Sequence, residues 1–165
     1  MELLIPGLIL VALMAYASTR IKKRAAEAFD AEPIDNPRYS LVKPAGFLHV
    51  LSDPNHDFMA YSKEFGEDEN ARHRRATIEV DTINGSDIEA VCAAVRESAS
   101  EIRTRDGSGV VMDVDEQANE TEFRTVYKII ADTAVIYRLR FAVVADHFDE
   151  YTSRVDDTIE SFAIK

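Results

Sequence analysis

Cysteine and basic charge are scarce in this 165-residue sequence. A single cysteine excludes an internal disulfide framework and a zinc site built from several cysteines. The 19 Lys and Arg residues are outnumbered by 30 Asp and Glu residues, and the net charge of −11 argues against nucleic acid as the main partner. Hydrophobic residues make up 46% of the chain, so its composition is that of a folded protein and not of a disordered one.

Recognisable catalytic and cofactor-binding motifs are also missing. The sequence has no G-x-S-x-G, Walker, G-x-G-x-x-G or H-E-x-x-H pattern. Its four histidines are scattered, and none forms a pair at the i, i+4 spacing of a metal-binding helix. We therefore expect a protein without catalytic activity, and we predict no cofactor and no metal.

The sequence does have an apolar segment near its amino terminus. Residues 3–19 contain no charge over seventeen positions, which at about 1.5 Å per residue makes a helix of roughly 25 Å, at the short end of what crosses a bilayer. Tyr16 stands where an aromatic side chain meets the membrane surface. A basic collar follows at once, formed by Arg20, Lys22, Lys23 and Arg24. We predict that residues 1–24 are a single transmembrane anchor and that the collar and Tyr16 lie at the membrane interface.

The rival interpretation is a cleaved signal peptide. Ala15-Tyr16-Ala17 matches the A-x-A pattern of a cleavage site, but Met1-Glu2 lacks the positive charge that such peptides carry at their start. Because cations near the membrane stay on the cytoplasmic side, the collar predicts an inner-membrane protein with its amino terminus outside and its domain in the cytoplasm. From residue 38 onward the domain carries 15 basic and 25 acidic residues, a net charge of −10.

The rest of the chain divides into a linker and a domain. Pro33 and Pro37 interrupt any helix that continues past the collar, so residues 25–37 are predicted to be a linker and residues 38–165 a globular domain. Within the domain, alternating apolar residues predict strands at 39–43, 47–51, 58–65, 73–83, 109–114, 121–130 and 134–145.

Two amphipathic helices complete the predicted domain. The first begins with Ser86 as N-cap and Glu89 three residues on, and its apolar stripe runs from Ile88 to Ile102. The second is expected to be capped by Asp146 and to carry a stripe that ends at Phe162. The sequence thus predicts an α+β fold in which one transmembrane helix precedes an antiparallel sheet covered by two amphipathic helices.

Three short motifs carry a family resemblance. They are Lys-Pro-x-Gly-Phe at 43–47, Tyr-Ser-Lys-Glu-Phe at 61–65 and Ile-Glu-Ser-Phe at 159–162. Over residues 38–165 the chain resembles the PsbP-like fold, a group that includes an extrinsic photosystem II subunit and a Ran-binding import factor. The resemblance implies a sheet-and-helix sandwich that acts as a binding or accessory module. It assigns no functional residue to this chain.

Three functional hypotheses follow from these observations. The leading one is a membrane-anchored, non-enzymatic accessory module with a membrane-protein partner and with the lipid bilayer around residues 3–19. The second is an enzyme whose site is assembled from distant residues such as Asp53, His56, Asp57 and His147. The third is a small-ligand binder with a pocket between sheet and helices. A calcium loop from Asp53 to Glu64 is disfavoured, because Phe58 stands where the loop needs glycine.

Overall fold

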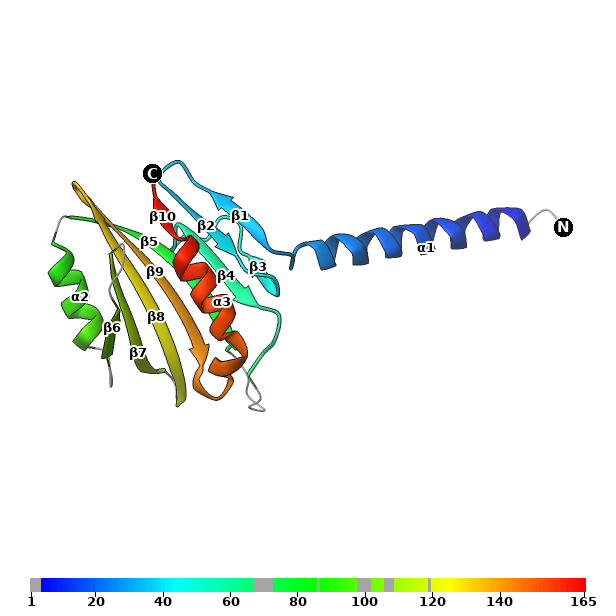
Figure 1. Cartoon of the computed structure of the whole chain (residues 1–165). Coiled ribbons are helices and arrows are strands. Elements are labelled where there is room, and N and C mark those ends of the chain that lie inside the picture. Colours follow the sequence, from blue (N-terminus) through cyan, green and yellow to red (C-terminus); the bar gives the residue numbers. More distant parts are fainter. Residues whose placement is uncertain (1–3, 67–72, 86, 98–101, 106–108, 119) are drawn as a thin grey trace.

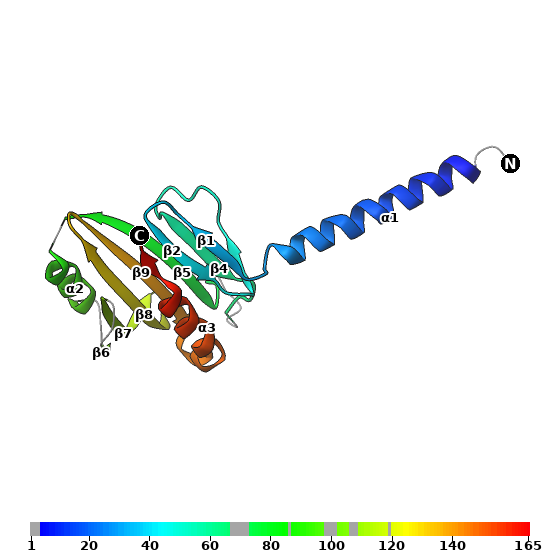
Figure 2. The same ribbon diagram turned by 45° about the horizontal axis from the view of Figure 1, so that its top comes forward.

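The amino-terminal segment is a long helix that stands apart from the rest of the molecule. The computed structural model describes residues 4–66, 73–85, 87–97, 102–105, 109–118 and 120–165, and for residues 4–12 and 102–105 it describes the backbone alone. Helix α1 (Leu4–Glu27) is continuous over 24 residues. It projects away from the domain in both views of the ribbon (Figures 1 and 2).

The domain is built on two antiparallel sheets within the described residues. In spatial order the larger sheet holds β3 (Phe47–His49), β4 (Phe58–Ser62), β5 (Ala76–Asn84), β9 (Val135–Val144), β8 (Thr121–Asp132), β7 (Val110–Ala118) and β6 (Ile102–Arg105). The smaller sheet has the order β1 (Glu32–Asp35), β2 (Tyr39–Lys43) and β10 (Ala163–Ile164). The predicted α+β class with an antiparallel sheet is therefore confirmed, and the chain forms a second, smaller sheet that the sequence analysis did not predict.

One face of the larger sheet carries the main hydrophobic core. Helix α3 (Phe148–Ser161) and the smaller sheet cover this face, and in Figure 1 the helix lies in front of the larger sheet. The alternation in β5 places Ala76, Ile78 and Val80 in this core, each fully buried. Tyr39 from β2 and Phe162 after α3 pack with their rings tilted, and the ring centroids are 5.8 Å apart. The apolar stripe predicted for the final helix is thus buried against the sheet.

The opposite face carries a second, smaller core. Because side chains alternate along a strand, Val126 of β8 belongs to the main core while its neighbour Tyr127 points to the other face. There, helix α2 (Ile88–Glu97) packs Cys92 and Val95 against β7, β8 and β9. The two helices therefore cover opposite faces of one sheet, which leaves the part of the second face beyond α2 for polar side chains.

Several predicted boundaries differ from the structure. The helix predicted to reach Ile102 ends at Glu97, and residues 102–105 form strand β6, which pairs with β7. The strand predicted to end at residue 114 continues to Ala118, and β7 pairs with β8 along this whole length. Ser86 lies outside the described residues, and the Asp87 carboxylate accepts the N–H of Ala90 at the start of α2.

The final helix also begins differently from the prediction. A single 3-10 turn, Ala145–His147, precedes α3, and the first residue of the helix is Phe148. Asp146 therefore lies within that turn and is not the helix cap. The residue at the cap position, His147, makes no capping hydrogen bond with its side chain.

The segment predicted as a linker is partly a strand. Residues 32–35 form β1, which pairs with β2 over four residues from Glu32 opposite Lys43 to Asp35 opposite Ser40. Pro33 is tolerated because β1 lies at the edge of its sheet, where one side of the strand needs no donor. Strand β1 therefore lies within the predicted linker, and only four residues separate it from α1.

Those few residues are held by a buried lysine. The Lys43 ammonium is fully buried and donates to the backbone carbonyl oxygens of Asp30 at 2.6 Å, Phe47 at 2.8 Å and Ala28 at 3.4 Å. Gly46, at a φ of +89° that favours glycine, donates its N–H to the Phe29 carbonyl. Burial lowers the pKa of Lys43. The exit of α1 is thus fastened to β2 and β3.

A second buried lysine fastens α3 in the same way. Lys128 of β8 donates to the carbonyl oxygens of Ile159 and Phe162, each at 2.8 Å, where the last turn of α3 leaves carbonyls without helical partners. Burial lowers the pKa of Lys128 as well. The cation near the carboxyl end of the helix also interacts favourably with the helix dipole.

The joint at Lys43 yields a stability prediction. Replacing Lys43 by Met keeps the length of the side chain but leaves three carbonyl oxygens without their charged donor, and we expect a loss of about 1–3 kcal/mol in the free energy of unfolding. Thermal unfolding of the full chain in mild detergent measures it. Lys22→Met is the control, since Lys22 is exposed on α1 and makes no contact with the joint. Equal losses for the two variants would show that the buried ammonium does not stabilise the joint.

Candidate functional site

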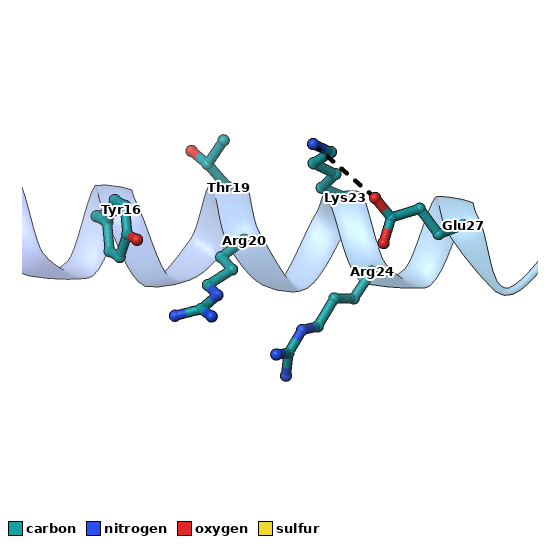
Figure 3. Close-up of a pocket in the computed structure, with 6 residues that line it drawn as sticks. All are labelled: Tyr16, Thr19, Arg20, Lys23, Arg24 and Glu27. Carbon is teal, nitrogen blue, oxygen red and sulfur yellow. Dashed lines mark ion pairs between the residues drawn. The ribbon is translucent and has the colours of Figure 1, made fainter.

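The basic collar lies on one exposed helix and is largely confined to one of its sides. All five predicted interface residues, Tyr16, Arg20, Lys22, Lys23 and Arg24, are exposed on α1. Four of them line a shallow surface together with Thr19 and Glu27 (Figure 3). At about 100° per residue, Lys22 falls on the far side of the helix from Arg20, and it does not line that surface.

The charges on this surface are paired unequally. Lys23 lies 3.9 Å from the Glu27 carboxylate, four residues on, and both side chains are mostly exposed. Arg20 and Arg24 form no ion pair with any other residue that the structure describes. In Figure 3 the two arginines extend to one side of the helix, away from the Lys23–Glu27 pair. Exposed guanidinium groups of this kind are typical partners of anions.

The anchor prediction is not confirmed by the structure. Over the stretch whose side chains are described, no helix is both long and apolar enough to cross a membrane. Residues 1–12, which supply most of the predicted membrane segment 3–19, lie outside that stretch. The transmembrane segment and the role of the collar at the membrane therefore stay predictions.

The residues named for an assembled enzyme site lie in two places in the fold. His56 bonds Asp81 near one end of β5, whereas His147 follows the end of β9 that pairs with the opposite end of β5. The Asp53 carboxylate accepts two backbone N–H groups of its own turn, and Asp57 is exposed. Asp53, His56 and Asp57 therefore share one turn, and His147 lies apart from them.

Metal and thiol chemistry find no support either. Among the described residues, no group of three or more His, Cys, Asp or Glu side chains could hold a metal ion. Glu64, the last position of the calcium-like pattern, accepts a hydrogen bond from the Tyr151 hydroxyl. Cys92 is buried in the second core, and burial raises the pKa of its thiol, which disfavours the reactive thiolate.

The part of the second face beyond α2 carries a charged network. Asp81 accepts hydrogen bonds from His56 at 2.7 Å and from Arg138 at 2.6 Å. In the next row of the sheet, Arg140 lies 3.1 Å from Glu79 and 2.7 Å from Glu116. The sequence analysis placed none of these partners, because the pairs join residues 24 to 61 positions apart.

Glu116 is the centre of that network. Its carboxylate accepts hydrogen bonds from the Tyr127 hydroxyl at 2.5 Å, from Arg140 and from Thr125 at 3.1 Å. Burial opposes the charge, but these donors outweigh it and lower the pKa of Glu116. Burial and the bond to Glu116 raise the pKa of Tyr127. Because its charges are already paired with one another, the network serves the stability of the sheet.

The comparisons with known proteins bear on the fold. No family model matches the chain, and no curated protein matches its sequence. Three solved structures are similar over 82–83% of this chain, each with 12% identity. They are CyanoP, the cyanobacterial PsbP of Synechocystis sp. PCC 6803 (TM-score 0.50, 94% of that chain), LpqN of Mycobacterium tuberculosis (0.55, 91%) and the Ran-binding protein Mog1p of Saccharomyces cerevisiae (0.51, 96%).

These likenesses define the class of the domain. With TM-scores of 0.50–0.55 over 82–83% of its length, the chain shares the overall fold of these proteins, the PsbP-like fold. The resemblance predicted from three short sequence motifs is confirmed. At 12% identity the likeness concerns the fold and assigns no site.

The charged network predicts a pH dependence. Replacing Glu116 by Gln weakens its bonds to Arg140, Tyr127 and Thr125, and we expect the free energy of unfolding at neutral pH to fall by about 1–2 kcal/mol. The pKa of Glu116 is lowered in the folded state, so its contribution is complete above the usual glutamate value of about 4.3 and is lost as the pH falls below it. The stability of the variant should therefore depend less on pH in that acidic range.

Unfolding curves between neutral and acidic pH measure both effects. Glu122→Gln is the control, since Glu122 is an exposed residue of β8. If Glu116→Gln matches this control at every pH, the network does not contribute to stability.

Proposed function

We propose that this protein is a membrane-anchored, non-catalytic accessory module that holds a PsbP-like domain at the cytoplasmic side of a membrane for a membrane-protein partner. The observation that carries the proposal is that the domain does not cover the large apolar side chains of α1 that the structure describes. Leu13, Met14 and Ile21 on α1 are 59%, 63% and 68% exposed. Isolated apolar side chains on a surface are ordinary. Several of them on one projecting helix are typical of a surface that contacts a membrane or another protein.

The sequence around that helix supports a bilayer as the cover. The uncharged residues 3–19 lead directly into the collar, and cations just beyond an apolar segment favour the cytoplasmic side. The domain that follows carries a net charge of −10, so it is expected to stand off an anionic inner leaflet while the collar contacts it.

The rest of the described chain supports a binding role over catalysis. The charged network around Glu116 is paired internally, and His147 lies apart from the other residues named for an enzyme site. Among proteins of similar fold, Mog1p is a Ran-binding protein and LpqN is involved in cell envelope biogenesis. An accessory module whose domain binds another protein is compatible with these names.

Membrane attachment and orientation are tested together in cells that express the full chain. We expect the protein to stay with membranes in alkaline carbonate, and protease added to intact cells to spare the domain. Replacing Arg20, Lys22, Lys23 and Arg24 by Gln should produce a mixture of orientations, because the segment then has no charge bias. The variant Arg38→Gln/Arg96→Gln, which neutralises exposed cations of the domain, should keep the native orientation.

Two outcomes contradict the proposal. Release of the full chain by carbonate would exclude a transmembrane anchor. Amino-terminal sequencing that finds the mature protein beginning at Ser18, with the domain outside, would establish the cleaved signal peptide.

A further inference from the structure

One side of α1 carries Tyr16, Arg20 and Arg24, whose hydrogen-bond donors and charges suit an anion. The three residues recur at a spacing of four, so each lies one turn along from the last, with a rise of about 6 Å between them. All three are exposed, and they line a shallow surface of α1 together with Thr19, Lys23 and Glu27. In Figure 3 Arg20 and Arg24 extend to one side of the helix, and Thr19 and Lys23 lie on the other.

The only acid on that surface is already engaged. Glu27 lies 3.9 Å from Lys23, and in Figure 3 this pair is turned away from the side to which Arg20 and Arg24 extend. Within the described part of the chain, neither arginine has an acidic partner. By contrast, Arg138 and Arg140 in the domain are both paired with carboxylates. Two guanidinium groups one turn apart are therefore left for an external anion.

The height of these side chains along α1 indicates the kind of anion. Tyr16 falls within the last residues of the uncharged run 3–19, and Arg20 is the first charged residue after it. If that run occupies the bilayer, these side chains lie at the level of the lipid headgroups. Guanidinium groups bind phosphate through paired N–H groups, and a tyrosine hydroxyl can donate one more hydrogen bond to it.

We propose that Tyr16, Arg20 and Arg24 form a binding site for the phosphate group of an anionic phospholipid at the cytoplasmic surface of the membrane. This inference rests on the proposed function, because only an inserted helix holds the three side chains at that level. It goes beyond general attraction between the collar and the membrane, because it assigns the lipid to one side of the helix. Lys22 has the same charge but lies on the far side, and it is not part of the site.

The test uses the full chain reconstituted into vesicles of phosphatidylcholine, alone or with a minor fraction of phosphatidylglycerol. Flotation and carbonate extraction first establish insertion. The protein is then taken up in mild detergent, and native mass spectrometry measures how much phosphatidylglycerol stays bound. We expect wild-type protein to retain it, and Arg20→Gln and Arg24→Gln each to reduce retention about fivefold.

Matched variants separate a site from bulk charge. Lys22→Gln removes one positive charge between the same two positions, and it should retain nearly the wild-type amount of lipid. Arg20→Lys/Arg24→Lys keeps the charge but loses the paired N–H groups, so retention should fall part of the way. Inorganic phosphate in the detergent buffer should not displace the lipid.

The possible outcomes test the membrane anchor and the lipid site separately. If the full chain does not insert into phosphatidylcholine vesicles, both the proposed function and the lipid site are overturned. If it inserts but Lys22→Gln loses as much phosphatidylglycerol as Arg20→Gln, or Arg20→Lys/Arg24→Lys loses none, the anchor stands and the site is overturned. Displacement by inorganic phosphate would mean that the arginines bind a free anion and would overturn the assignment to lipid.

Discussion

The buried ammonium of Lys43 is the interaction on which the arrangement of helix and domain depends. Taking a lysine charge out of water is costly, and here it is compensated by three backbone carbonyls, two just after α1 and one in β3. The lysine thereby joins three segments that the larger sheet alone does not hold together. The Gly46 N–H also donates to the Phe29 carbonyl oxygen, and these bonds together hold the residues that follow α1 against the folded domain.

If α1 is a membrane anchor, this joint fixes the orientation of the domain relative to the membrane. A domain on a loose tether samples every orientation, whereas one fastened within a few residues of its helix presents a defined side to the membrane and to a neighbour in it. The lysine and glycine that make the joint belong to the Lys-Pro-x-Gly-Phe motif at 43–47, which was one of the three signs of the PsbP-like fold. In this chain Lys43 and Gly46 of the motif hold the residues that follow α1.

Local pattern predicted most of the architecture but not its joints. The alternation in β5, the stripes of α2 and α3 and the antiparallel class could be read from spacing, because each depends on neighbours within one element. Strand β1 was missed because Pro33 and Pro37 argue for a linker, and only its partner β2 makes it a strand. The roles of Lys43, Lys128 and Glu116 could not be foreseen, because a charge in a strand is typical of an exposed residue and the partners of Lys128 are more than thirty residues away. The residues of the basic collar, in contrast, could be identified from the sequence alone. The structure adds which of them line the same surface of α1.

The account is tested most directly by the distance between helix and domain in a membrane. The substitutions Ala26→Cys on α1 and Ser153→Cys on α3, made in a Cys92→Ala background, each provide an exposed thiol for one spin label. Pulsed electron resonance then measures the distance between the two labels in the full chain in lipid nanodiscs. The account predicts a single narrow distance distribution, which broadens when Lys43 is replaced by Met. A broad distribution in the protein with Lys43 intact would contradict it, because residues 28–31 would then act as a flexible tether.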